Sequence, residues 1–225
     1  MLVRDWMTVN VMSLGVNSSV LDAAEILREK NIRQFPVIDG GGRLVGIVSD
    51  RDLRDAMPSK FIPGDFAMEH GGGLYTLTAG DIMTLEPISV APDMAMTEVA
   101  EILVKHKVGG LPVVDAGQLC GIITQADVLR FLCTASGSAQ GGIQFAIRMD
   151  GRRGLLAELL CDLRDLGVVF TSVFTAHDPV QTGFSNAYVT VDEIGDLSVE
   201  AVVGRLQEKY EMLFYVNEGV TVDLM

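Results

Sequence analysis

An internal repeat constrains the fold of this chain more than any other feature of its sequence. When the sequence is shifted against itself by about 76 positions, similar segments coincide. They are Met7-Thr8 with Met83-Thr84, residues 24–27 with 100–103, residues 36–39 with 112–115 and, after a one-residue deletion, residues 46–52 with 121–127. About fourteen identities in roughly fifty aligned positions exceed chance, so residues 1–135 are a tandem duplication.

Each copy of the repeat predicts the same succession of elements. In the first copy, a helix over residues 19–30 begins at a possible capping box, and its apolar residues recur at helical spacing. Two extended segments, 35–39 and 44–48, flank a glycine turn and predict a hairpin, and a second helix follows from Ser49 or Asp50. One such unit cannot cover both faces of so short a sheet, so we expect the two copies to pack together.

The sequence predicts an α+β chain with several segments. We expect the first repeat at 1–57, a linker at 58–79, the second repeat at 80–134, a small and polar flexible linker at 135–142, a C-terminal domain at 143–217 and a tail at 218–225. The C-terminal domain reads βαββαβ, which is the split ferredoxin-like arrangement.

Charge and composition exclude several functional classes. The formal charge of −13 would repel a polyanion and no basic patch stands out, so we expect no nucleic-acid partner. The sequence has no apolar run of membrane-spanning length and no secretory signal after Met1, so we expect a cytoplasmic protein without a membrane partner. Cys120, Cys133 and Cys161 stand in apolar surroundings and are predicted to be buried thiols.

The sequence contains no catalytic constellation. His70, His106 and His177 lack the mutual spacing of a metal site or a triad, and the glycines at 71–73 are not followed by the Lys-Ser/Thr of a phosphate loop. We therefore predict a protein that is not an enzyme, with no catalytic residues, no metal and no cofactor.

The strongest functional signal is a motif, Gly-x-x-Ser/Thr-x-x-Asp, that occurs once in each repeat. Its members are Gly46, Ser49 and Asp52 in the first copy, and Gly121, Thr124 and Asp127 in the second. A glycine near a strand end admits a close neighbour, the hydroxyl residue lies where a helix start favours a phosphate, and the carboxylate suits a ribose diol. The alternative is that Ser49 and Thr124 are only helix N-caps and that the aspartates favour the helix dipole.

The repeats resemble cystathionine-β-synthase (CBS) domains, which are tandem regulatory modules that commonly bind adenosine nucleotides. The resemblance rests on the Met-Thr start, the helix, x-Pro-Val-x-Asp and the motif above, and it covers about residues 1–135. It implies a nucleotide cleft that takes the Ser/Thr and Asp from one repeat and adenine-sandwiching residues from the other. One implied site combines Ser49 and Asp52 with Thr84, Pro87 and Val108, and the other combines Thr124 and Asp127 with Thr8, Val11 and Ile32.

The resemblance also implies that the two sites differ. Members of the family that hold charged nucleotides tightly often place a basic residue just before the x-Pro-Val strand. The first repeat has Arg33-Gln34 there, whereas the second has Gly109-Gly110. Because a guanidinium forms charge-assisted hydrogen bonds with phosphate, we predict that the Asp52 site dominates for charged nucleotides. The alternative is that Arg33 is a solvated surface residue.

The C-terminal domain resembles an ACT domain, a small βαββαβ module that regulates amino-acid metabolism, often by binding an amino acid at a subunit interface. The matching positions include Asp150, Gly154 and Leu155, which the resemblance marks as an effector site, and Arg153 stands where the family usually has proline. An amino-acid site and a purely dimerising role both remain open. The order CBS, CBS, ACT resembles the CBS–ACT proteins named for acetoin utilisation.

These observations predict a regulatory homodimer that senses an adenine nucleotide between its CBS repeats and passes the state to the ACT domain or to a partner, a metabolic enzyme or a transporter. The alternatives are a dimerising scaffold whose clefts are empty and an amino-acid sensor that acts through the ACT domain.

Overall fold

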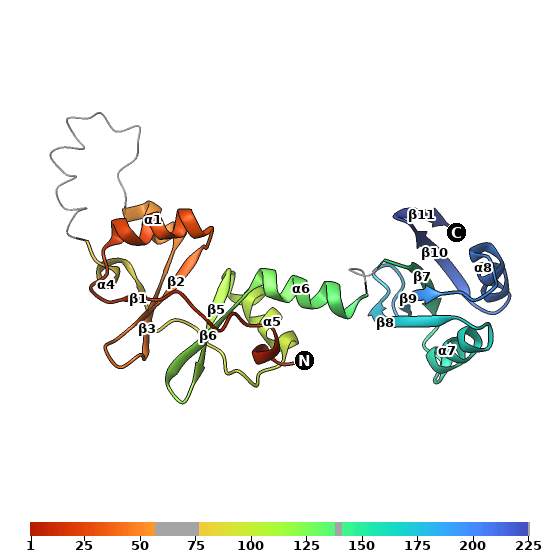
Figure 1. The fold of residues 1–225 in the computed structure, drawn as a ribbon. Coiled ribbons are helices and arrows are strands. Elements are labelled where there is room, and N and C mark those ends of the chain that lie inside the picture. The colour runs from red at the N-terminus through yellow and green to blue at the C-terminus, as the bar shows by residue number, and fades with distance from the viewer. Residues whose placement is uncertain (57–76, 138–140, 225) are drawn as a thin grey trace. The chain divides into compact units, whose positions relative to one another are not determined.

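The computed structural model describes residues 1–56, 77–137 and 141–224. The chain divides into two compact units, residues 1–131 and 132–225, which are considered separately (Figure 1). The predicted linker residues 58–76, with His70 and the glycines at 71–73, lie outside the described residues. Among the helices that are described, none is long and apolar enough to cross a membrane.

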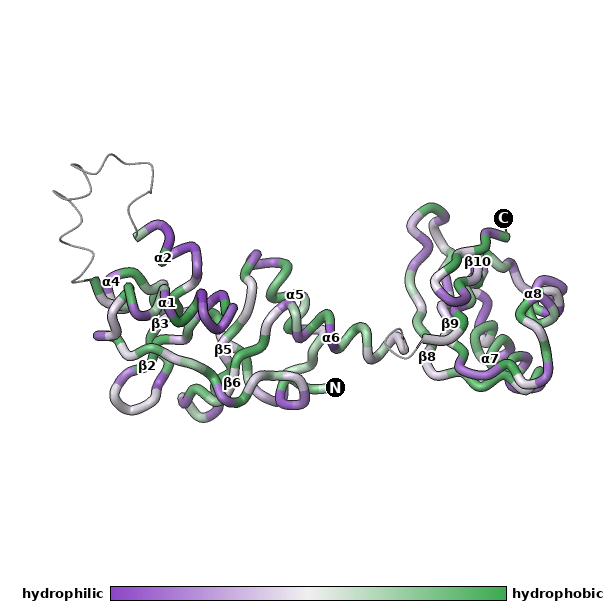
Figure 2. The backbone as a smooth tube through the Cα atoms, turned by 45° about the horizontal axis from the view of Figure 1, so that its top comes forward, coloured by the Kyte–Doolittle hydropathy of each residue, from purple (hydrophilic) through white to green (hydrophobic). Residues whose placement is uncertain are grey.

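The first repeat forms the predicted succession of elements. It contains β1 (Leu14–Gly15), α1 (Val20–Lys30), β2 (Gln34–Ile38), β3 (Leu44–Ser49) and α2 (Asp50–Ala56). Helix α1 begins because Ser19 Oγ accepts the N–H of Asp22, and it ends at Asn31, which adopts the left-handed conformation at φ 52°. Helix α2 is largely hydrophilic, and Leu53 is its buried residue (Figure 2).

The second repeat has the same architecture. It contains α4 (Ala79–Ile82), β4 (Thr84–Leu85), α5 (Met96–His106), β5 (Gly110–Asp115), β6 (Gln118–Thr124) and α6 (Gln125–Ala135). The β2–β3 and β5–β6 hairpins carry register shifts at matching places, after Val37 and after Val113. The duplication seen in the sequence therefore extends to the irregularities of the backbone.

The segments that lead into each repeat pack on the other repeat. Strand β4 pairs with β3, and Met83 packs in the core of the first repeat. The N-terminal 3₁₀ helix η1 (Val3–Asp5) contributes Val3 to the core of the second repeat, and Thr8 bridges to Ile122 in β6. The predicted repeat boundaries, 1–57 and 80–134, do not show this exchange. Strand β3 of the first repeat pairs with β4 of the second, and β6 of the second repeat pairs with Thr8 of the first.

The second unit contains one antiparallel sheet. Its elements are β7 (Ile143–Met149), α7 (Leu155–Asp165), β8 (Val169–His177), β9 (Ser185–Glu193), α8 (Val199–Gln207), β10 (Glu211–Asn217) and β11 (Val220–Asp223). The strand order is β11-β10-β7-β9-β8, and α7 and α8 share one core with the sheet. The predicted βαββαβ order is therefore present in this unit.

The last residues of the chain are not the predicted tail. Residues 220–223 form β11, which pairs with β10 across a tight turn. Glu218 and Gly219 both adopt positive φ, 49° and 77°, which is the geometry that joins two antiparallel strands with little splay. The predicted boundary at 217 is wrong, because β10, the turn and β11 form one hairpin.

The flexible linker predicted at 135–142 is partly built into the fold. Ala135 ends α6, and the Ser136 carbonyl accepts hydrogen bonds from Ser172 Oγ at 2.6 Å and Thr190 Oγ1 at 2.9 Å. Gly142 has φ 98°, and a Cβ there would lie 2.4 Å from the Val191 carbonyl oxygen. Small residues at these positions allow the backbone to lie close to the sheet. A small and polar composition is typical of such a close approach as well as of a flexible linker.

The prediction of buried thiols was wrong for two of the three cysteines. Cys133 and Cys161 are exposed, and Cys120 is half-buried. Cys161 lies on α7 between the inward-facing Leu159 and Leu163, so the helical period turns it away from the core.

Candidate functional site

The two motifs have the same local geometry at the starts of α2 and α6. Asp52 Oδ2 accepts the N–H of Ser49 at 2.7 Å and its hydroxyl at 2.6 Å. Asp127 Oδ2 accepts the same two groups of Thr124 at 2.8 and 2.6 Å. The helix-capping alternative is therefore present in the structure. The cap uses Oδ2 of each carboxylate, and Oδ1 takes no part in it.

Ser49 of the first motif lies on the sheet face that points away from the core of its own repeat. Phe35, Val37 and Val48 are buried in the core of the first repeat. Since side chains alternate along a strand, Ser49 points to the opposite face.

The exchange of lead segments brings a predicted site residue to this face. Thr84 pairs with Ile47 in the β3–β4 ladder. Directly paired residues share a face of the sheet, and so do residues two apart on one strand, so Thr84 and Ser49 share one face. In the second repeat, the Thr8 bridge to Ile122 places Thr8 in the same relation to Thr124.

The motif glycines make room for the lead segments. A Cβ at Gly46 would lie 2.4 Å from Met83 Sδ, and a Cβ at Gly121 would lie 2.5 Å from Met7 Sδ. The sequence predicted that these glycines admit a backbone or a ligand. Here they admit the methionine that precedes each site threonine.

Gln34 and Gly110 form a contact between the two repeats. A Cβ at Gly110 would lie 2.0 Å from Gln34 Nε2, which is buried and has no hydrogen-bond partner among the described residues. The sequence predicts Gln34 at the Ser49 site, and the backbone of Gln34 does pair with Ser49. Its amide, however, reaches toward the second repeat, where Gly110 pairs with Thr124.

The other predicted site residues differ in exposure. The Arg33 carbonyl accepts the N–H of Asp50 at 2.9 Å, and its side chain is exposed. The apolar residues predicted to sandwich adenine are half-buried at all four positions: Pro87, Val108, Val11 and Ile32. Their contact with a ligand stays a prediction.

This fold defines a class of protein, the tandem module in which two α/β repeats exchange their lead segments and face each other with matched Ser/Thr and Asp residues. The family model of the CBS domain matches residues 3–59 and 79–134. The chain belongs to the CBS-domain family.

Relatives and solved structures match the same region. A CBS domain-containing protein of Dictyostelium discoideum is 32% identical over 134 residues, which are 58% of this chain and 90% of that protein. A structure of CBSX2 in complex with AMP is 36% identical, with TM-score 0.50, over 59% of this chain and 96% of that one. AcuB, a candidate acetoin utilization protein from Vibrio cholerae, is 30% identical, with TM-score 0.52, over 62% and 96%.

The same module also occurs within enzymes. Inosine-5'-monophosphate dehydrogenase of Nitrosopumilus maritimus is 32% identical over 123 residues, but these are only 22% of that enzyme. The family match ends at residue 134, so the second unit is described by its own structure.

The predicted effector residues of the second unit line cavities at the loop before α7. Gly154 and Leu155 line one of about 400 Å³, and Asp150 and Leu155 line a smaller one of about 110 Å³. The Asp150 carboxylate accepts the backbone N–H of Arg152, which lowers the pKa of that carboxyl. Gly154 has φ 90° and an open surrounding, so its backbone conformation, not a close contact, explains the glycine.

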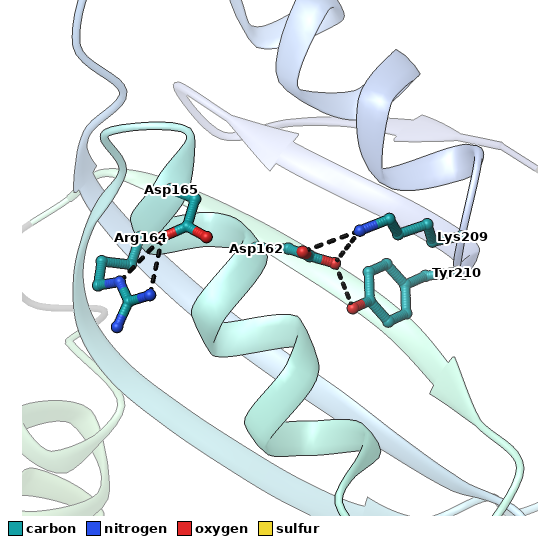
Figure 3. A network of polar contacts seen from close by, with 5 residues as sticks. All are labelled: Asp162, Arg164, Asp165, Lys209 and Tyr210. Atoms are coloured by element: carbon teal, nitrogen blue, oxygen red, sulfur yellow. Dashed lines mark hydrogen bonds and ion pairs between the residues drawn. The ribbon is translucent and has the colours of Figure 1, made fainter.

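Sequence reasoning missed a polar network beside this loop (Figure 3). Asp162 on α7 accepts hydrogen bonds from Tyr210 OH at 2.6 Å and from Lys209 Nζ at 2.9 and 3.0 Å. Burial, followed by the bond to Asp162, raises the pKa of Tyr210, and the Tyr210 hydroxyl lowers the pKa of Asp162. These side chains line a cavity of about 660 Å³. Polar residues at helical spacing on α7, Glu158 and Asp162, were the available signal.

A buried carboxylate makes the stability of the second unit dependent on pH. The backbone N–H groups of Gln181 and Val180, each 2.8 Å from Asp178 Oδ1, hold its pKa at about 2, and Arg148 adds to this. Because the folded-state pKa is depressed, the stabilisation is complete above the ordinary value of 3.8 and is lost as the pH falls toward about 2.

We therefore expect the urea midpoint of the second unit, followed by circular dichroism, to fall between pH 5 and pH 2.5, and the fall to be smaller in Asp178→Asn. Asp196→Asn, which removes an exposed carboxylate of the same unit, is the control and should keep the full fall. Equal slopes for wild type and Asp178→Asn would contradict the assignment.

Proposed function

We propose that the chain is a regulatory protein that binds an adenosine nucleotide in two clefts between its CBS repeats. The observation that carries the proposal is the duplicated site. Each motif aspartate caps its helix through Oδ2 and leaves Oδ1 outside the cap, and the hydroxyl residue that it caps shares a sheet face with a threonine from the other repeat. A ribose diol needs such an acceptor, and a helix start offers N–H groups to a phosphate. The structure of CBSX2 with AMP, at 36% identity, supports the choice of ligand class.

The signal would pass from the repeats to another surface. A nucleotide that contacts both repeats biases their relative position only if it binds one arrangement more tightly than the other. We propose that the chain forms a homodimer. The nucleotide signal would reach either its second unit or a separate partner protein, such as a metabolic enzyme or a transporter. In this reading the chain is a sensor and carries out no reaction.

The second unit has a candidate function of its own, an ACT-like site for an amino acid. The cavity that Gly154 and Leu155 line at the start of α7 supports this candidate. An amino acid that stabilises the chain additively with AMP would support two separate sites.

A thermal-shift series tests the nucleotide proposal. A ligand that binds only the folded state stabilises it by about 2.7 kcal/mol at a hundred times its Kd. We expect AMP, ADP or ATP to raise the melting temperature. S-adenosylmethionine and NAD, tested in the same way, show whether the site also accepts larger adenosine compounds. No shift with any of them, while the homodimer stays intact, would favour the scaffold with empty clefts.

A further inference from the structure

The two motif aspartates differ in what contacts Oδ1, the carboxylate oxygen that takes no part in the helix cap. In the second repeat, Arg130 Nη1 lies 2.9 Å from Asp127 Oδ1, the oxygen that the helix cap leaves over. The Asp127 side chain is only 6% exposed, whereas the Arg130 side chain is 64% exposed. The arginine therefore engages the accessible part of the carboxylate from the solvent side.

Among the described residues of the first repeat, this ion pair has no counterpart. The position equivalent to Arg130 is Asp55, which carries the wrong charge to pair with Asp52. The neighbouring arginine, Arg54, pairs instead with Asp50 at 2.9 Å. Asp52 Oδ1 thus has no hydrogen-bond partner in the part of the chain that the structure describes.

We propose that Arg130 is an internal competitor for the second cleft, which occupies the carboxylate oxygen that a ligand hydroxyl needs and so makes this cleft the weaker one for adenosine compounds. The proposal rests on the proposed function. It adds a residue that the family motif does not contain and an asymmetry that is independent of Arg33.

Ionic strength provides a signature of this competition. The Arg130 guanidinium is mostly solvent-exposed, so added salt screens its attraction to Asp127. A neutral ligand such as adenosine gains no ion pair in return. Its affinity for the second cleft should therefore rise with salt when Arg130 is present, and should be insensitive to salt when Arg130 is absent.

The experiment measures adenosine affinity by calorimetry in full-length protein that carries Asp52→Asn, so that the second cleft dominates the signal. We expect Arg130→Ala to tighten binding about two- to fivefold at low salt and to abolish the salt dependence. The reciprocal change, Asp55→Arg in an Asp127→Asn background, should weaken the first cleft by a similar factor. Arg54→Ala removes an arginine–aspartate pair of the same kind away from Asp52 and should change neither affinity.

Unchanged or weaker binding in Arg130→Ala would overturn the proposal, since weaker binding would make Arg130 a ligand contact. A double-mutant cycle of unfolding between Arg130→Ala and Asp127→Asn tests the ion pair without any ligand, and zero coupling would also overturn it. If no variant binds adenosine or AMP while the cycle shows coupling, the proposed function fails but the pairing of Arg130 with Asp127 stands.

Discussion

Asp52→Asn is expected to weaken AMP binding about ten- to a hundredfold, and Asp127→Asn to weaken it much less. Asp52 Oδ1 faces no competing cation among the described residues, whereas Asp127 Oδ1 already holds Arg130. Loss of a hydrogen bond to a charged group costs about 1.5–3 kcal/mol, which corresponds to the expected factor. Calorimetric titration of both variants with AMP measures the difference.

The helix cap has to be separated from the binding role of Asp52, because the same carboxylate caps α2. A matched control exists at Thr78, whose N–H and hydroxyl donate to Asp81 Oδ2 at 2.8 and 2.7 Å in the same geometry. Asp81→Asn disturbs an equivalent cap outside the predicted site and should leave AMP affinity unchanged. Equal losses in Asp52→Asn and Asp127→Asn would contradict the predicted asymmetry of the two clefts.

The repeat architecture could be predicted from the sequence because the two copies of the duplication can be compared with each other. Two copies of one pattern agree on the helix, the hairpin and the capped second helix, so local ambiguity in one copy is resolved by the other. The exchange of lead segments was less accessible. Residues such as Val3 and Met83 read as apolar in either repeat, and only the packing decides which core receives them.

The side-chain contacts at the site could not be predicted from the sequence, for a different reason. The position of Arg130 three residues after Asp127 was visible, but its ion pair depends on a rotamer chosen in three dimensions. The reach of Gln34 to Gly110 likewise depends on how the two sheet faces meet. The polar network of Asp162 and Tyr210 joins residues far apart in the sequence, where no periodic pattern links them.

We expect Gly121 to be essential for the packing of the N-terminal segment on the second repeat. A Cβ there would lie 2.5 Å from Met7 Sδ, 3.1 Å from Met7 Cγ and 3.2 Å from the Thr8 carbonyl oxygen. The sulfur can move, but the carbonyl belongs to the Thr8–Ile122 bridge and cannot move without breaking it. Gly121→Val should therefore destabilise the first unit by about 1–3 kcal/mol through overpacking.

The only tryptophan of the chain reports on this segment. Trp6 packs edge-on against Phe131 with ring centroids 5.7 Å apart, next to Met7. Displacement of the segment should expose Trp6, so Gly121→Val should shift its fluorescence to the red and lower the urea midpoint measured with it. Gly40→Val is the control, since a Cβ at Gly40 meets nothing within 4 Å. A variant at Gly121 with wild-type emission and midpoint would show that the N-terminal segment is not held by its contact with this glycine.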